Sequence, residues 1–354
     1  MSTIPKKLST PVNSSIFASR LLLYFRITMN NDTDCEIIRW SQQAAKIVEP
    51  IFYMCIIAAI NHLLFWIQFI AYPSVRQRSM QWLYAYLGSD LLLLIRFFVF
   101  YIYRWSSICV PHSLRLIICY CEAIFDNYLN LLQSYILLAL NVCRYIQIVY
   151  NHNVYSSNGY AIIIAHLLIY TLPLLGHLVT IMFGWSKLES PPGDTCDLIP
   201  KPIVVRLLFL LFSYFIPVIL TLVFLWMCLN HIRNTEGIRT KEIVDARLKH
   251  HRQLVIQSVV FYSLWLIFWS PHLLVFPFCY KHSTVGMIAQ ILNYISILID
   301  PMVIAALDVR FLQAWKSTND HFNRHIRRQY SIRIPMHSPS LSSARLERQS
   351  IRSR

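Results

Sequence analysis

Five charged side chains lie within stretches of the sequence that are otherwise apolar, namely Asp90, Glu122, Asp126, Arg144 and Asp300. On insertion scales a charge near the centre of a membrane helix costs about 2.5 to 3.5 kcal/mol, so such residues are candidate functional sites. Neighbouring carboxylates can hold a cation or share a proton, and an arginine can bind an anion, reach the lipid headgroups or wait for a protein partner. These residues therefore indicate the binding of charged groups.

The histidines, serines and cysteines do not form a catalytic or zinc-binding pattern. Thirteen histidines are scattered along the chain, and no His-Glu-x-x-His, Gly-x-Ser-x-Gly or Cys-x-x-Cys sequence occurs. Those patterns mark metalloproteases, serine hydrolases and thiol or zinc sites. We therefore expect that the protein is not an enzyme and has no metal site built from these residues.

The elements that hold the five charges are long apolar segments. The chain is 56% hydrophobic and 14% charged, which is typical of a membrane protein. Segments long enough to cross a bilayer run over Ile47 to Ala71, Trp82 to Tyr103, Leu116 to Val149, Tyr160 to Phe183, Ile203 to Leu229, Leu254 to Phe278 and Val285 to Leu307. They do not alternate apolar with polar residues, as strands of a barrel would. The predicted fold is an all-α membrane protein, a bundle of seven transmembrane helices.

The distribution of Lys and Arg predicts the orientation in the membrane. Segments on the side of the C-terminal tail carry eighteen Lys or Arg and the opposite loops carry six, and basic loops stay in the cytoplasm. We expect a multi-pass plasma-membrane protein with an extracellular N-terminus and a cytoplasmic C-terminus. The net charge of +15 then lies beside anionic lipid and needs no nucleic acid. The two glycosylation sequons, at Asn13 and Asn31, fall in the outer segment.

Four regions follow along the chain. Residues 1–46 form an extracellular segment, in which Met29 is an alternative start, and residues 47–307 form the bundle. Residues 308–318 place apolar side chains mostly on one side of a short amphipathic helix along the membrane. Residues 319–354 are polar and basic and are predicted to be a disordered cytoplasmic tail.

Landmarks in six of the seven segments, in order, resemble those of the rhodopsin-like (class A) G-protein-coupled receptors, of a divergent invertebrate type. They are Asn61, Asp90 in YLGSDLLL, Cys-Arg-Tyr at 143 to 145, Pro217 in FIPVIL, Trp269 and Pro271 in FWSP, and Asp300 and Pro301 in DPMVI. The resemblance covers about Ile47 to Trp315, although the fourth segment lacks the family's usual tryptophan. It implies a cell-surface receptor that binds an extracellular ligand and activates a heterotrimeric G protein.

The resemblance also implies roles for individual residues. Arg144 and Tyr145 would couple to the G protein. The switch positions would be Pro217, Trp269, Pro271 and Pro301, of which the three prolines let their helices bend. A polar network that could hold a sodium ion would comprise Asn61, Asp90, Ser296 and Asp300. Cys119 and Cys196 would form the extracellular disulfide. Cys109 and Cys121 compete for that pairing, and Cys35 with Cys279 is a second possible bridge.

One departure from the family concerns the residue before Arg144. The family usually has an acid there and often another on the facing sixth helix, whereas this chain has Cys143 and a basic KHHR stretch around His251. We expect a more loosely held resting state with higher basal signalling. The alternative role for Arg144 is an interfacial arginine that extends to the headgroups.

The ligand site is predicted in the outer half of the bundle. Asp126 and Tyr294 resemble the ammonium-binding pair of amine receptors, and Glu122 lies one helical turn from Asp126 on the same face. Trp269 and His272 would line the same cavity. Two acids favour a cationic peptide, such as a neuropeptide, over an amine.

Other classes of membrane protein fit less well. The segment Val285 to Leu307 lacks the lysine that a light-sensing rhodopsin needs for its retinal. Seven glycines in the whole chain and no visible repeat disfavour a transporter with broken helices. A seven-helix scaffold without signalling remains an alternative because Cys143 and Ile304 depart from the family's pattern.

Overall fold

The computed structural model describes residues 35–37, 39–73, 75–106, 109–150, 152, 154–157, 159–189, 195–236, 242–275, 284–308, 310–313 and 316. Several predictions therefore lie outside the described residues, namely those on Asn13, Asn31, Cys279, Trp315 and the tail. The described part contains seven helical segments that are long and apolar enough to cross a membrane. The predicted all-α bundle of seven transmembrane helices is confirmed.

The spanning helices follow the predicted segments closely. They are α2 (Gln42–Ala71), α3 (Gln81–Trp105), α4 (His112–Val149), α6 (Gly159–Met182), α7 (Ile203–Leu210) continued by α8 (Ile216–Glu236), α9 (Glu242–Val275) and α10 (Thr284–Leu307). The helices α2, α4 and α9 begin well before the apolar segments, at Gln42, His112 and Glu242, because a helix can continue into water once its backbone bonds are made. In α2 the side chain of Ser41 caps the start by accepting a 3.1 Å hydrogen bond from the Ala44 amide.

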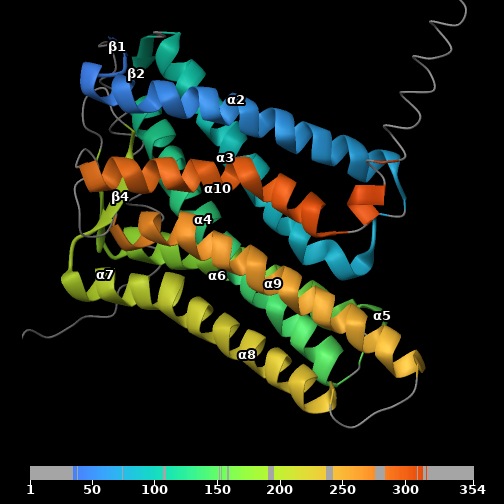
Figure 1. Ribbon diagram of the computed structural model, residues 1–354. Helices are drawn as coiled ribbons and strands as arrows, with labels where there is room; N and C mark the ends of the chain where they lie inside the picture. Colours follow the sequence, from blue (N-terminus) through green and yellow to red (C-terminus); the bar gives the residue numbers. More distant parts are fainter. Residues whose placement is uncertain are drawn as a thin grey trace, which may run out of the picture.

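Short elements close the two ends of the bundle (Figure 1). The strands β1 (Cys35–Ile37) and β2 (Cys109–Pro111) pair antiparallel, as do β3 (Ser186–Glu189) and β4 (Asp197–Pro200). Gly184 makes the turn before β3 with φ of +65°, which glycine adopts without strain. The helix α5 (Val154–Ser157) lies at the opposite end, as does the turn η1 (Arg78–Met80), which leads into α3.

The helix α4 lies at the centre of the bundle and contacts α3, α6, α8 and α9. Buried residues make up 56% of its most apolar stretch, compared with 17% for α6, which lies at the periphery. Figure 1 shows α10 between α2 and α9, with α8 on the far side of α9. Residues of α4 that face the interior of the bundle can therefore contact most of the other helices.

Two prolines predicted as bending points leave backbone carbonyls that side chains from neighbouring helices satisfy. Pro301 lacks the N–H that would bond to the carbonyl of Ile297. That carbonyl lies 3.3 Å from Nε2 of the buried His62, and Asn61 Nδ2 donates to the carbonyl of Leu298 over 3.2 Å. Because lipid offers no donors, such partners are needed for a proline within a span.

Pro217 follows a π-helical turn, η2 (Leu211–Phe215), between α7 and α8. The wider turn and the missing proline N–H free two carbonyls, and two α4 hydroxyls donate to them. Tyr135 donates to the carbonyl of Phe212 over 2.9 Å and Ser134 donates to the carbonyl of Ser213 over 3.1 Å. The irregular turn is thus fastened to the central helix.

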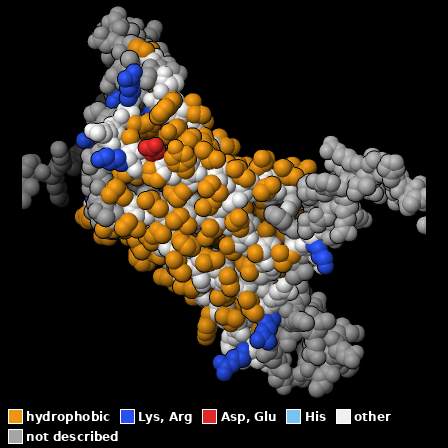
Figure 2. Space-filling model, turned by 45° about the horizontal axis from the view of Figure 1, so that its top comes forward, with side chains coloured by type: hydrophobic (Ala, Val, Ile, Leu, Met, Phe, Trp, Pro, Cys, Tyr) orange, Lys and Arg blue, Asp and Glu red, His pale blue; other side chains and the backbone are white. Residues whose placement is uncertain are grey.

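Large apolar side chains cover the outside of the bundle. Leu167 on α6 and Trp226 on α8, for example, are more than half exposed. On the face in Figure 2, apolar side chains fill the middle and the Lys and Arg side chains lie toward the ends. An apolar belt around a helix bundle is what the hydrocarbon of a bilayer requires, so the protein is a multi-pass membrane protein.

Beyond α10 the structure describes a short helical stretch at residues 310–313. Phe311 is completely buried and stacks on Phe65 of α2 with ring centroids 4.6 Å apart, whereas Leu312 is half exposed. The Oδ1 of Asp308 accepts a 2.9 Å hydrogen bond from the Arg310 amide at the start of this stretch. These contacts agree with an amphipathic segment over the part of residues 308–318 that is described.

Candidate functional site

The predicted ligand residues meet in a small cavity between α2, α3, α4, α9 and α10. Its volume is about 40 Å³, and the residues that carry its chemistry are Arg96, Arg104, Glu122, Asp126, His272 and Tyr294. Tyr294 also packs edge to face on Phe97 with centroids 5.4 Å apart. The structure thus brings together Asp126, Glu122, His272 and Tyr294 as expected, but it adds two arginines to them.

Arg96 of α3 forms an ion pair with Asp126 of α4. Its Nη1 lies 2.6 Å from Asp126 Oδ1, and the two side chains are 11% and 25% exposed. The Nε of Arg96 also donates to the backbone carbonyl of Glu122 over 3.3 Å. Asp126 is therefore already neutralised, although part of its surface remains open to the cavity.

Arg104 and Glu122 form a second, more deeply buried ion pair one helical turn further out. Both nitrogens of the Arg104 fork donate to the two Glu122 oxygens, with Nη1 2.8 Å from Oε1, and the side chains are 4% and 2% exposed. Glu122 Oε2 also accepts a 3.2 Å hydrogen bond from the Cys196 amide, and the Arg104 guanidinium lies 4.6 Å from the Trp40 ring centroid. Glu122 thus joins α3, α4 and the loop before β4.

The predicted disulfide between Cys119 and Cys196 is confirmed. Cys119, near the start of α4, is bonded to Cys196, and their Cα atoms are 5.3 Å apart. Of the competitors, Cys121 is a free, exposed cysteine and Cys109 belongs to a different disulfide. The bond holds Cys196, which directly precedes β4, against α4 and beside the Arg104 and Glu122 pair.

Trp269 is buried beneath the cavity rather than in its wall. Its Nε1 donates to Asn130 Oδ1 of α4 over 3.3 Å, and its ring stacks on Trp265 with centroids 4.2 Å apart. Next to it, Tyr214 of η2 donates to Ser270 Oγ over 3.1 Å. The segment of α9 that contains Pro271 is therefore bonded to α4 and to the π-helical turn.

The predicted polar network lies deeper, between α2, α3, α4 and α10. Asp300 Oδ2 accepts hydrogen bonds from Tyr86 at 2.7 Å and Ser296 at 3.2 Å, and Asp90 Oδ1 accepts one from Gln133. The Asp90 Oδ2 atom is buried with no partner among the described residues. A proton or a cation would satisfy that oxygen, so both remain chemically suitable.

Arg144 contacts α9 at the inner end of the bundle. Its guanidinium donates to Ser258 Oγ and, over 3.2 Å, to the carbonyl of Leu254. The neighbouring Tyr145 ring lies 5.3 Å from that of Phe224 on α8. Arg144 therefore joins α4 to α9 through two uncharged acceptors, and its guanidinium is directed toward α9 and not toward the headgroups.

Cys143 points to a different set of neighbours, Trp82 of α3 and Tyr155 of α5. Burial and the adjacent Cys143 sulfur raise the pKa of the Tyr155 phenol well above its usual value, so its hydroxyl stays protonated at neutral pH. Tyr155 thus joins the short helix α5 to the inner end of α4 as a neutral group.

Sequence reasoning missed the partners of the two acids. Arg96 was not among the five charged residues singled out, and Arg104 falls just after the predicted span Trp82 to Tyr103, but α3 continues to Trp105 and buries Arg104. A usable signal was present, because Arg96 and Arg104 are eight residues apart and so lie about two turns apart on one face of a helix. Asn130, Asn293 and His62 carried no comparable signal, since amides and imidazoles occur singly in many apolar helices.

No protein-family model and no curated protein sequence matches the chain. A search of solved structures finds the crystal structure of squid rhodopsin, with a TM-score of 0.60 and 15% sequence identity, covering 78% of this chain and 80% of that chain. The chain therefore has a rhodopsin-like seven-helix fold. The sequence of α10 contains no lysine, so a retinal Schiff base cannot form there.

Proposed function

We propose that this protein is a cell-surface receptor that binds an extracellular ligand at its outer cavity and activates a heterotrimeric G protein at its inner end. The observation that carries the proposal is the position of α4. One face of this helix contributes Glu122 and Asp126 to the outer cavity, and its other end holds α9 through Arg144. A ligand that shifts α4 against α9 at one end can thus change the tether at the other.

The proposed ligand is a peptide with a cationic side chain that enters the cavity at Asp126. A cavity of about 40 Å³ is far smaller than the roughly 300 to 1,000 Å³ of pockets that enclose a small molecule. It admits the tip of one side chain, so most of the ligand would lie over the outer surface, which favours a peptide over an amine. The positions of Tyr294 and His272 support a contact to that tip, while Trp269 would respond from beneath it.

The ion pairs give the two acids different roles in this proposal. Asp126 is the acid that a cation can reach, because its side chain is 25% exposed whereas that of Glu122 is 2% exposed. Glu122 is saturated by Arg104 and the Cys196 amide, so its role is to hold the mouth of the cavity. A cationic ligand would displace Arg96 from Asp126, and that exchange would be the first step of activation.

At the inner end, release of the Arg144 tether would let α9 move outward and expose Arg144 and Tyr145 to the G protein. Pro271 weakens α9 by removing one backbone hydrogen bond, and Pro217 and Pro301 weaken α8 and α10 in the same way. Breaking hydrogen bonds to a serine and a carbonyl costs less than breaking a buried ion pair. The proposal therefore includes the higher basal signalling expected from the sequence.

The polar network is proposed to hold either a sodium ion or a shared proton between Asp90 and Asp300. The free Asp90 Oδ2 and the hydroxyl of Ser296 supply oxygen ligands, which suit a hard cation. Bound there, the ion would neutralise two carboxylates that otherwise repel each other. Asn61 would act from the adjacent helix by fixing α10 through the carbonyl of Leu298.

The test is second-messenger output, cAMP and calcium, in cells that express the protein or Arg144→Ala at equal surface density. The proposal predicts basal or peptide-stimulated output that disappears in Arg144→Ala. The same cells report whether the N-terminus is outside, through an antibody tag on intact cells. No output from the unchanged protein in any G-protein pathway would favour a seven-helix scaffold or a transporter instead.

The ligand class is tested by changing each partner of the accessible ion pair. A cationic ligand should lose at least tenfold in potency in Asp126→Asn and gain in Arg96→Gln, because Asp126 is then free from competition. Binding of an anionic ligand to Arg96 would give the opposite pair of results. The panel should contain basic peptides and amines, so that relative potencies distinguish the two cation types.

A further inference from the structure

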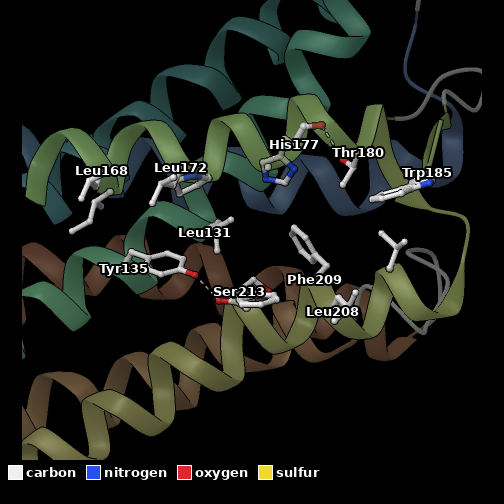
Figure 3. Close-up of a pocket in the computed structure, with 15 residues that line it drawn as sticks. Leu131, Tyr135, Leu168, Leu172, His177, Thr180, Trp185, Leu208, Phe209 and Ser213 are labelled. Atoms are coloured by element: carbon white, nitrogen blue, oxygen red, sulfur yellow. Dashed lines mark hydrogen bonds between the residues drawn. The ribbon is translucent and has the colours of Figure 1, made fainter. Parts of the chain in front are cut away.

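A separate apolar cleft opens on the membrane side of the bundle between α4, α6 and the segment of α7 and η2 (Figure 3). Its volume is about 390 Å³, and its lining residues include Leu172, Gly176 and His177 of α6 and Phe209 and Ser213 from the α7 side. This volume falls within the roughly 300 to 1,000 Å³ of small-molecule sites. It shares no lining residue with the outer cavity.

Two polar atoms in the wall of the cleft lack hydrogen-bond partners among the described residues. They are His177 Nε2 and Ser213 Oγ, in side chains that are 5% and 1% exposed respectively. A buried polar atom without a partner costs about 1 to 3 kcal/mol, so such atoms call for an explanation. Figure 3 shows His177 directed from α6 into the cleft, with Ser213 on the opposite wall.

The surroundings of these atoms define what can bind. Among the described residues that line the cleft, none is Asp, Glu, Lys or Arg. The cleft opens beside exposed apolar side chains such as Leu172 and Leu208, so its occupant arrives from the hydrocarbon of the bilayer. A charged phospholipid headgroup or a carboxylate would find no counter-charge there.

We propose that this cleft binds a neutral membrane lipid of the sterol type, with a mostly hydrocarbon body and one hydroxyl. A hydroxyl can both donate and accept, so it can bond to either tautomer of His177 and to Ser213. A rotation of either side chain would bring its polar atom to the cleft surface. The lining of α6 from Leu168 to Thr180 extends over about 18 Å, which suits an elongated ligand.

The site would also act on the bending region of the bundle. Ser213 belongs to η2, whose carbonyls are fastened to Ser134 and Tyr135 of α4, and the adjacent Tyr214 bonds to Ser270 beside Pro271. A lipid held by Ser213 would stiffen this irregular turn. Binding itself, however, does not depend on G-protein coupling, so the inference stands or falls separately from the proposed function.

The experiment uses the full chain in lipid nanodiscs with a photoreactive sterol analogue, followed by mapping of the labelled peptides. Saturable labelling of residues 159–182 and 203–215, competed by unlabelled sterol, is expected. Gly176→Leu should reduce it at least tenfold, because a side chain at Gly176 projects into open space. The matched control is Gly159→Leu, which adds the same side chain to the same helix outside the cleft and also meets no neighbour.

Two further variants test the hydroxyl without filling the cleft. His177→Phe keeps a ring against Phe209 and Ser213→Ala removes one atom, and each should weaken sterol competition about two- to tenfold. In the unchanged protein, a sterol analogue without the hydroxyl should compete for labelling as weakly as the sterol itself does in these two variants. Leu172→Trp replaces Gly176→Leu if the latter does not fold.

Three results would overturn the inference. They are labelling spread evenly over the lipid-facing helices, sterol labelling unaffected by both cleft-filling variants, and equal competition by an acyl-chain phospholipid. The last would identify the occupant as ordinary boundary lipid. Loss of second-messenger output with intact sterol labelling would count against the proposed function and leave the lipid site in place.

Discussion

Glu122 and Asp126 are both acids of the outer cavity, but their burial gives them different consequences when changed. Glu122 and Arg104 are 2% and 4% exposed, so neither charge has water as an alternative partner. Asp126 and Arg96 are 25% and 11% exposed. Removing one member of a buried ion pair leaves an uncompensated charge, whereas the loss is smaller where water can enter.

We therefore predict that Glu122→Gln destabilises the protein by about 3 to 5 kcal/mol, because it strands the Arg104 charge. Thermal unfolding of the detergent-solubilised protein measures this change, with Asp126→Asn as the matched control with a smaller loss. The double variant Arg104→Leu with Glu122→Leu should be more stable than either single variant. An unfolding temperature of Glu122→Gln equal to that of the unchanged protein would contradict the prediction.

His62 provides a second prediction for a single residue. His62→Leu removes the polar contact to the carbonyl that Pro301 leaves free. It should cost about 0.6 kcal/mol, the average for hydrogen bonds between membrane helices, and at most about 1.7 kcal/mol. The control is Leu63→Ala, a change at a neighbouring side chain that is 60% exposed. If both variants unfold at the same temperature, the contact between His62 and the Ile297 carbonyl does not stabilise the protein.

At the scale of the helices, α4 and α9 are held together at their inner ends by hydrogen bonds from the Arg144 guanidinium to uncharged groups of α9. Ser258→Ala removes one acceptor for Arg144 and should raise basal second-messenger output, because the tether is weakened. Ser263→Ala, an exposed serine on the same helix, should leave output unchanged. Lower output from Ser258→Ala at equal surface expression would show that this contact stabilises the active arrangement instead.

Cys143→Asp should shift the equilibrium between the resting and active arrangements of α4 and α9 toward the resting one. A carboxylate next to Arg144, within the buried surroundings of Trp82 and Tyr155, would hold the guanidinium in its resting position. Basal output should therefore fall below that of the unchanged protein. Cys143→Ser serves as the control of similar size without charge, and an identical baseline in Cys143→Asp and Cys143→Ser would rule out this explanation.

The helices show which parts of the structure can be predicted from sequence. The seven spans follow from apolar length alone, and the Cys119–Cys196 disulfide follows from family landmarks. The pairing of Asp126 with Arg96 was missed because it depends on how α3 and α4 face each other, which no single segment specifies. The π-helical turn before Pro217 was missed for the same reason, since the hydroxyls that satisfy it belong to α4.

The whole molecule has a rhodopsin-like seven-helix fold. The proposed function depends on the cavity at one end of the bundle and on the Arg144 contacts at the other. The helix α4 contributes residues to both the outer cavity and the inner tether. The lipid-facing cleft is lined in part by the π-helical turn η2, which connects α7 to α8. The invertebrate-type subfamily, the plasma membrane and the orientation of the termini stay predictions. The central claim is that the inner end of this bundle activates a G protein through Arg144.

The most direct measurement is nucleotide exchange on purified heterotrimeric G proteins by the full chain reconstituted in nanodiscs, compared with Arg144→Ala. The account predicts exchange above the rate of empty nanodiscs for at least one G protein, even without ligand, and no increase with Arg144→Ala. Because Arg144 bonds to Ser258 and Leu254, equal thermal stability of the two proteins must be verified. Exchange that is identical with Arg144→Ala, or absent for every G protein with and without basic peptides, would contradict the receptor assignment.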